Sequence, residues 1–182
     1  SMTSKRSKKI RTRGNFRTLI PFFLMLLFGM LSTGCKNSDK DSEMMVPANF
    51  EMELENSGGE RVSMEDFRGK KIFFNVWATW CPPCIEEMPT IHNLYEEIGE
   101  QEDVVFLMLT MDQDFQKAKD FLTRYGYNFE IYRPIGAIPA LYHTKLIPTT
   151  FVINSQGYLV LQHDGVGEFD TKEFKEYFSS VK

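Results

Sequence analysis

Two cysteines separated by two prolines, in Trp80-Cys81-Pro82-Pro83-Cys84, constrain this chain more than any other feature of its sequence. They follow residues 71–77, an almost wholly apolar and β-rich run that predicts a central strand covered on both faces. They precede residues 84–98, where apolar side chains recur every three or four positions, as on one face of a helix. The cysteine pair therefore lies where a buried strand leads into a helix.

This position predicts thiol chemistry for the pair. The unpaired N–H groups and the dipole of a helix N-terminus favour a thiolate at Cys81. Pro82 and Pro83 fit there, because the first helical turn needs no backbone donor from them. Cys84, further inside the helix, is expected to be the less exposed sulfur. We expect Cys81 to attack a substrate disulfide, or to be attacked in the reverse direction, and Cys84 to resolve the mixed disulfide.

Other uses of a CxxC pair fit the sequence less well. Half of a zinc site would need further ligands, but the only other cysteine is Cys35 and the histidines show no ligand spacing. Haem attachment is excluded because Ile85 follows Cys84. A purely structural disulfide is conceivable in an exported protein. However, such a disulfide does not require Trp80, two prolines and a strand-to-helix junction.

Charge is divided unevenly along the chain. The whole chain has 21 Lys and Arg against 25 Asp and Glu, a net charge of −4, yet residues 1–34 contain seven Lys and Arg and no acidic residue. Residues 35–182 consequently carry −11. This acidic balance argues against nucleic acid as a partner.

The basic N-terminal segment predicts export. Its apolar run, residues 19–31, is shorter than the roughly 20 residues of a membrane-spanning helix, so residues 1–34 are interpreted as a signal peptide. The run ends at Ser32-Thr33-Gly34-Cys35, which resembles the lipobox of bacterial lipoproteins, although Ser32 stands where leucine is usual. The resemblance implies lipid attachment at Cys35, with residues 35–45 as a flexible tether. An ordinary signal peptide with Cys35 as a free thiol, or an uncleaved anchor, remain alternatives; all three place the rest of the chain outside the cytoplasm.

Residues 46–182 are predicted to form one α/β domain. Alternating or wholly apolar runs predict strands over 50–54, 61–64, 71–77, 104–109, 150–153 and 158–161. Helical spacing predicts helices over 84–98 and 115–125, the second ended by Gly126, and a last helix that starts near residue 170.

Two separated blocks of the sequence resemble the TlpA/ResA-like thioredoxins. The first runs from Phe74 to Cys84 and continues as Glu86-Glu87-Met88-Pro89, and the second is Ile147-Pro148-Thr149-Thr150-Phe151-Val152-Ile153-Asn154. An upstream segment, Phe50 to Lys70, resembles the N-terminal hairpin of the same family. The resemblance covers about residues 46–178. It implies a thioredoxin fold, a central mixed sheet flanked by helices, with an added N-terminal β-hairpin.

The second block resembles the segment that carries the cis-proline facing the CxxC in thioredoxin folds. X–Pro is the only peptide bond for which the cis form is cheap. Pro148 has no N–H, and the backbone at Ile147 could pair with an extended segment of a substrate. A loop proline that starts a strand would be the preferred interpretation of Pro148 without the two cysteines. Trp80, Pro82 and Pro83 complete the expected substrate-binding surface, whereas Trp77 is expected in the core.

Two further side chains bear on the mechanism. Asn75 stands where ordinary cytoplasmic thioredoxins carry a buried acid, and an amide cannot titrate. Glu87 matches a glutamate characteristic of the TlpA/ResA-like branch. It lies three positions after Cys84 on the same helix face, so it could relay the proton of that thiol. The alternative is a solvated carboxylate, as expected for Glu86.

These observations predict a membrane-tethered thiol–disulfide oxidoreductase on the periplasmic side, with no cofactor beyond the Cys81–Cys84 disulfide, no metal, and a monomeric state. The family resemblance favours the reductive direction on exported proteins, with apocytochrome c as one candidate substrate and a membrane protein as electron donor. Copper handling is the second hypothesis, disfavoured because such assembly proteins resemble CxxxC with a distant paired histidine. A peroxiredoxin-like peroxidase would need a cysteine in a Thr/Pro-rich loop, which the sequence lacks.

Overall fold

An eight-stranded mixed sheet forms the centre of the computed structural model, which describes residues 45–182. The predicted signal peptide and Cys35 lie outside the described residues. The strands are β1 (Val46–Pro47), β2 (Glu53–Asn56), β3 (Arg61–Ser63), β4 (Lys71–Trp77), β5 (Val104–Thr110), β6 (Ile131–Ile135), β7 (Thr149–Ile153) and β8 (Tyr158–Asp164). Their order across the sheet is β1-β8-β7-β4-β5-β6-β2-β3.

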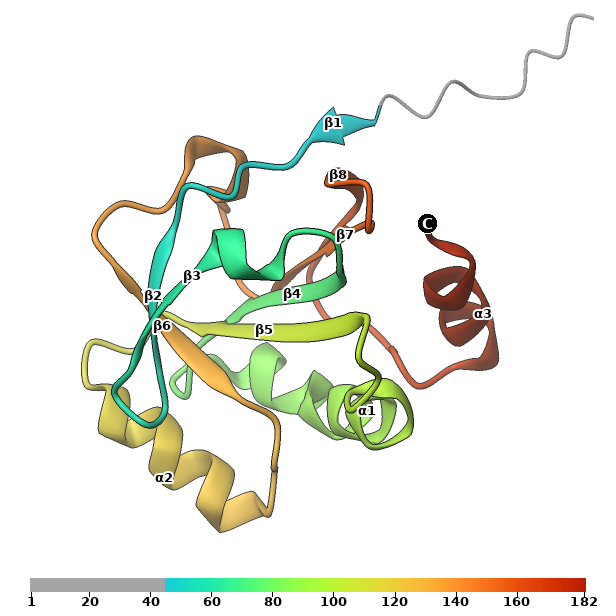
Figure 1. The fold of residues 1–182 in the computed structure, drawn as a ribbon. Coiled ribbons are helices and arrows are strands. Elements are labelled where there is room, and N and C mark those ends of the chain that lie inside the picture. Colours follow the sequence, from blue (N-terminus) through green and yellow to red (C-terminus); the bar gives the residue numbers. More distant parts are fainter. Residues whose placement is uncertain (1–44) are drawn as a thin grey trace, which may run out of the picture. The chain divides into compact units, whose positions relative to one another are not determined.

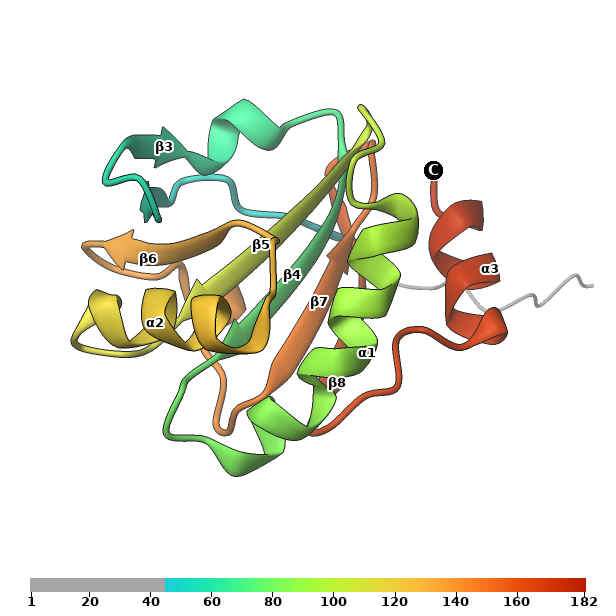
Figure 2. The ribbon, with the colours of Figure 1, turned by 90° about the horizontal axis from the view of Figure 1, so that it is seen from below.

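Five helical segments accompany the sheet: η1 (Met64–Phe67), α1 (Pro82–Ile98), α2 (Phe115–Tyr125), η2 (Ala140–Tyr142) and α3 (Lys172–Ser180). Figures 1 and 2 show α1 and α2 on one face of the sheet and η1 on the other. Within residues 45–182, no helix combines the length and the apolar character that crossing a bilayer requires.

The position of β4 explains its apolar sequence. It pairs in parallel with β5 and antiparallel with β7, so both of its edges are occupied and both of its faces are covered. Phe73 and Trp77 point into the core beneath the helices, whereas Phe74 and Val76 point into a second core on the opposite face. At its carboxyl end β4 leads into the loop before α1 (Figure 2).

The helices begin and end close to where the sequence predicted. In α1, Met88 and Ile91 of the predicted stripe are wholly buried and Ile85, Tyr95 and Ile98 are partly buried, whereas the wholly buried Leu94 was not predicted as part of it. α2 begins after the N-cap Asp114 and ends at Gly126, whose φ of 72° is the left-handed conformation that glycine adopts readily. The mixed sheet and its flanking helices confirm the predicted fold class.

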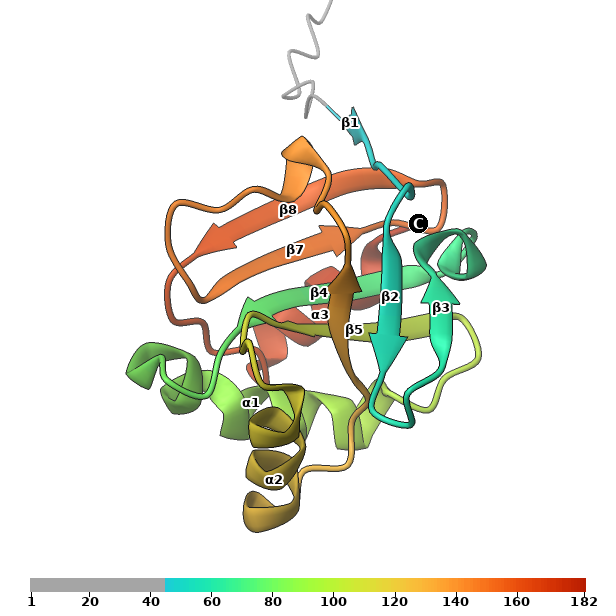
Figure 3. The ribbon, with the colours of Figure 1, turned by 90° about the vertical axis from the view of Figure 1, so that its left-hand side faces the viewer.

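The added hairpin is present, but its first strand begins later than predicted. β2 pairs antiparallel with β3, Leu54 opposite Val62 (Figure 3). The preceding residues are bent, because the N–H of Met52 donates to the carbonyl oxygen of Phe50 (2.9 Å). Phe50 and Met52 are nevertheless buried. The alternation of these residues with acidic ones therefore predicted their burial correctly, but the strand that it predicted over residues 50–52 is absent.

Strand β6 was not predicted, and it contains Pro134. Proline cannot donate a ladder hydrogen bond, so it argues against a central strand. β6 pairs with β5 only through Ile131 and Tyr132, while Pro134 lies further along, opposite Leu54 of β2. Pro134 is tolerated because it lies beyond the short stretch of β6 that is paired on both edges.

Candidate active site around Cys81 and Cys84

The two cysteines form a disulfide at the first turn of α1. Cys81 is the N-cap of the helix, and its Sγ accepts a hydrogen bond from the N–H of Cys84 (3.3 Å). Pro82 and Pro83 occupy the first two helical positions. Cys81 is 5% exposed and Cys84 is wholly buried, so the more accessible sulfur is at the N-cap. The arrangement can exchange thiols for a disulfide with no other reactive group.

The second sequence block faces this disulfide. The Ile147–Pro148 peptide bond is cis. The carbonyl oxygen of Ile147 lies 3.6 Å from Sγ of Cys81. The carbonyl of Pro148 is already occupied, because it accepts a hydrogen bond from the N–H of Gly165 (2.8 Å). The tertiary structure therefore brings together two motifs that are more than sixty residues apart, as the family resemblance implied.

Exposed apolar side chains accompany the pair in the chain. Trp80, which immediately precedes Cys81, is 64% exposed, and Pro82 and Pro83 are exposed as well. Leu146, directly before the cis-proline segment, is 49% exposed. Trp77 is wholly buried, as expected. An accessible apolar surface next to a disulfide is suited to contact a polypeptide.

Glu87 is buried and hydrogen-bonded on both oxygens. Its Oε1 accepts a hydrogen bond from Nδ2 of Asn75 (2.8 Å), and its Oε2 accepts one from the N–H of Gly167 (3.0 Å). Burial raises the pKa of Glu87 to about 7, although the hydrogen bonds from Gly167 and Asn75 and the nearby His163 oppose that rise. The solvated alternative is thus wrong for Glu87, whereas Glu86 is exposed as expected.

Asn75 supports this carboxyl from β4. Its Nδ2 also donates to Oγ1 of Thr150 on β7 (2.9 Å), and its Oδ1 is buried without a partner within residues 45–182. Asn75 therefore stands where ordinary cytoplasmic thioredoxins carry a buried acid, and its amide donates a hydrogen bond to Glu87. The sequence placed both residues near Cys84 but did not indicate that they contact each other.

Sequence reasoning missed Asp112, Thr79 and Gly167. Asp112 follows β5, and its carboxylate accepts hydrogen bonds from the N–H and the hydroxyl of Thr79, which lies two residues before Cys81. One signal could have revealed Asp112. The carboxyl ends of parallel strands meet at the same edge of a sheet, so an acid directly after β5 lies close to the loop after β4.

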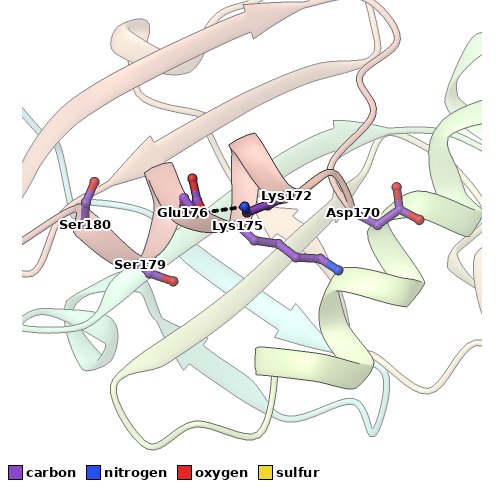
Figure 4. Close-up of a pocket in the computed structure, with 6 residues that line it drawn as sticks. All are labelled: Asp170, Lys172, Lys175, Glu176, Ser179 and Ser180. Carbon is purple, nitrogen blue, oxygen red and sulfur yellow. Dashed lines mark ion pairs between the residues drawn. The ribbon is translucent and has the colours of Figure 1, made fainter.

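Surface hollows lie both beside this loop and away from it. One of about 760 Å³ runs along α3 (Figure 4) and is lined by Asp170, Lys172, Lys175, Glu176, Ser179 and Ser180, none of them from the loops around the disulfide. A hollow of about 470 Å³ includes Met111 and Asp112, and another of about 320 Å³ includes Thr79 and Ile85. In the part of the chain that the structure describes, no three His, Cys, Asp or Glu side chains gather to hold a metal ion.

Comparison with known proteins shows the family of the chain. Residues 42–180 match the Redoxin family. Thioredoxin-like protein YneN of Bacillus subtilis is 34% identical over 124 residues, which cover 68% of this chain and 72% of that protein. Thiol-disulfide oxidoreductase ResA of Halalkalibacterium halodurans is 36% identical over 126 residues, which cover 68% of this chain and 70% of ResA.

Solved structures share the fold at lower identity. A structure described as a putative thiol:disulfide interchange protein DsbE from Chlorobium tepidum has a TM-score of 0.63 at 24% identity, covering 74% of this chain and 96% of that one. StoA from Bacillus subtilis has a TM-score of 0.57 at 24% identity, covering 74% of this chain and all of StoA. These likenesses support the architecture of the sheet and helices.

Proposed function

The chain belongs to the Redoxin family and is a thiol–disulfide oxidoreductase, and we propose that it reduces disulfides of exported proteins through Cys81 and Cys84. One observation gives this proposal its strongest support. The Cys81–Cys84 disulfide begins α1, and the carbonyl oxygen of Ile147 lies 3.6 Å from its more accessible sulfur. A substrate strand that reaches the backbone at Ile147 would bring its own disulfide to Cys81.

In the proposed cycle the reduced pair acts first as a nucleophile. The Cys81 thiolate attacks one sulfur of the substrate disulfide, a bond forms between Cys81 and that sulfur, and the other substrate sulfur leaves as a thiolate. Cys84 then loses its proton and attacks Sγ of Cys81. The mixed disulfide breaks, the second substrate thiol is released, and the enzyme pair is oxidised by two electrons. The helix N-terminus supports the thiolate on Cys81.

Glu87 is the proposed acceptor of the Cys84 proton. A general base works best when its pKa lies near the operating pH, and the pKa of Glu87 is raised to about 7. Both of its oxygens accept hydrogen bonds from Asn75 and Gly167 in the disulfide form. Reduction of the pair would therefore have to bring the Cys84 thiol or a water molecule to one of these oxygens.

The substrate surface comprises Trp80, Pro82, Pro83, Ile147 and Pro148. Trp80 and the two prolines are exposed, so they can cover apolar side chains of a polypeptide. The backbone of the half-buried Ile147 can form hydrogen bonds with a substrate. The buried Pro148 shapes the surface next to it and has no N–H that could compete for the substrate. This division of roles fits a substrate that is extended and exposes its cysteines, rather than a small thiol compound.

We assign the remaining parts of the function from the sequence. Residues 1–34 direct export, and a lipid on Cys35 tethers the domain on the periplasmic side. Oxidised enzyme needs two electrons per turnover, which a membrane protein supplies. The enzyme acts as a monomer, and apocytochrome c is the candidate substrate within the class of exported proteins that carry paired cysteines.

The proposal is tested by trapping substrates in the native host. A Cys84→Ser variant cannot resolve the mixed disulfide, so its substrates should stay bound to Cys81 and be identified by mass spectrometry. A Cys81→Ser/Cys84→Ser variant is the matched control. Trapped apocytochromes would support the maturation role, and a broad set of exported proteins would support general reduction. The absence of trapped partners, together with an equimolar copper complex of the wild-type protein, would instead favour copper handling.

A further inference from the structure

Asp112 is, besides Glu87, a buried carboxylate of the described residues, and the proposed cycle does not use it. It lies two residues after β5 and is 7% exposed. Its Oδ2 accepts hydrogen bonds from the N–H of Thr79 (2.9 Å) and the hydroxyl of Thr110 (2.7 Å), and its Oδ1 accepts one from the hydroxyl of Thr79 (2.6 Å). These contacts tie the end of β5 to the loop that carries Cys81.

Hydrogen-bond donors alone compensate this carboxylate. Within residues 45–182, Asp112 makes no ion pair. Burying a carboxylate is costly unless donors satisfy it, and donors to a charged acceptor form the stronger class of hydrogen bonds. The loop conformation and the buried carboxylate therefore stabilise each other, because Thr79 of that loop supplies two of the three donors and Thr110 supplies the third.

The contacts of Asp112 act where the loop has few other constraints. Before Thr79, the carbonyl of Trp77 accepts a hydrogen bond from the N–H of Met111 (2.8 Å). After it, the N–H of Cys81 donates to the carbonyl of Ala78 (3.2 Å). Thr79 lies between these two points, and Asp112 fixes both its backbone and its side chain. Asp112 thus links the end of β5 to the loop two residues before Cys81.

From these contacts we propose that Asp112 is a positioning residue for Cys81, and that its negative charge disfavours a second anion on that sulfur. This inference rests on the thiol chemistry proposed above. Stabilising the reduced form of such a pair makes it an oxidant. A neighbouring anion that opposes the Cys81 thiolate has the opposite effect, so it favours the pair as an electron donor. Asp112 would then favour the direction in which the enzyme reduces its substrate.

Other charged groups surround the same loop. Lys117, Asp120 and Arg124 of α2 line a hollow together with Thr79 and Ile85. Arg133 pairs with Glu55 in the hollow that also includes Asp112. Glu87 lies on α1, three residues after Cys84. The variants that substitute Asp112 or Thr79 keep all of these side chains. A shift in the pKa of the Cys81 thiol can therefore be assigned to the substituted residue.

The test compares Asp112→Asn with Asp103→Asn in the full chain. Both substitutions remove one charge next to β5, but Asp103 lies at the opposite end of that strand, where it is exposed and pairs with Lys71 (3.7 Å). Two quantities are measured: the pH dependence of alkylation at Cys81, read from the mass of its peptide so that Cys35 does not interfere, and the reduced fraction of the pair in glutathione buffers.

For Asp112→Asn we expect the apparent pKa of the Cys81 thiol to fall by about half a unit. The equilibrium with glutathione should shift by about threefold toward the reduced enzyme. Asp103→Asn should match the wild type in both. If Asp112→Asn also matches the wild type, the proposal is overturned. A wild type that reduces no protein disulfide at all would instead overturn the proposed function.

Thr79 variants keep the test decisive if Asp112→Asn does not fold. Thr79→Val removes the hydroxyl that donates a hydrogen bond to Asp112 but leaves the carboxylate in place, whereas Thr79→Ser keeps a hydroxyl at this position. We expect Thr79→Val to lower kcat/KM for a peptide disulfide about fivefold or more, because one hydrogen bond to a carboxylate is lost. Thr79→Ser should recover most of the lost kcat/KM. Equal rates for Thr79→Val and the wild type would contradict a positioning role.

Discussion

Oε1 of Glu87 on α1 accepts a hydrogen bond from Nδ2 of Asn75 on β4, 2.8 Å away, and neither side chain is accessible to solvent. This contact joins the helix that carries the cysteine pair to the central strand beneath it. It places a titratable group beside an amide that cannot take up a proton at neutral pH. Of these two side chains, only Glu87 can therefore change its protonation state near neutral pH.

Glu87 makes the stability of the fold depend on pH in a predictable direction. Its pKa rises from an ordinary value of 4.5 to about 7 in the folded chain. Below pH 4.5 the carboxyl is protonated in both states, so its favourable burial is fully present. As the pH rises toward 7, the unfolded chain releases the proton first, and the free energy of unfolding falls by on the order of 3 kcal/mol.

Glu87→Gln should remove this dependence. Relative to the wild type, we expect the variant to gain about 3 kcal/mol of stability between pH 4.5 and pH 8, measured by urea unfolding at each pH. The exposed Glu86→Gln is the matched control and should follow the wild type. A parallel pH dependence for Glu87→Gln and the wild type would show that Glu87 is ionised in the fold at an ordinary pKa.

Asn75→Asp should place two carboxyl groups within hydrogen-bonding distance in the core. They cannot both ionise there without a large penalty, so we expect a loss of about 3 kcal/mol at pH 8 and a smaller loss at pH 5. Asn93→Asp is the control, because it creates a similar pair with Asp170 at the exposed surface (Asn93 Nδ2 to Asp170 Oδ2, 2.7 Å). Its cost should stay below about 1 kcal/mol. Equal losses for the two variants would contradict the buried assignment.

Trp80→Ala should separate binding from stability. The side chain is 64% exposed, so its removal should change the free energy of unfolding by no more than about 0.5 kcal/mol. We expect KM for a peptide disulfide to rise about tenfold, since a stacked aromatic contact and its buried area are lost. Trp77→Ala should do the reverse and cost about 3–5 kcal/mol of stability, because Trp77 is wholly buried. An unchanged KM for Trp80→Ala would remove Trp80 from the substrate surface.

Gly167 permits the close approach of the last loop to α1. A Cβ at this position would lie 2.3 Å from the ring of Phe169, which is itself packed against Phe73 and Phe174. Gly167→Ala should therefore cost about 1–3 kcal/mol. It should also raise the pKa of Glu87 further, because the displaced N–H donates to its Oε2. Thermal unfolding and the pH profile of stability measure the two effects.

A surface glycine provides the comparison for that substitution. A Cβ at Gly58 would contact only the side chain of Asn56, at 3.3 Å. Gly58→Ala should change stability by no more than about 0.5 kcal/mol. If Gly167→Ala were as mild, the ring of Phe169 would have to move freely in the core.

The sequence by itself determined the parts of this protein that depend on near neighbours. The apolar run of β4, the helical spacing of α1 and the cysteines between them are local patterns, so they predicted the strand, the helix and the disulfide. The cis bond before Pro148 was implied by the resemblance of the second block to the cis-proline segment of thioredoxin folds. For the strand, the helix and the disulfide, the physical requirement lies within a few residues of the chain.

The tertiary structure alone decided which partners the side chains of this site contact. Glu86 and Glu87 are neighbours in the sequence, but only Glu87 is buried, and its Oε2 accepts a hydrogen bond from the N–H of Gly167, eighty residues further on. Asp112 holds Thr79 across thirty-three residues because β4 and β5 end at the same edge of the sheet. Burial and hydrogen-bond partners depend on segments that only the folded sheet brings together, so spacing along the chain cannot predict them.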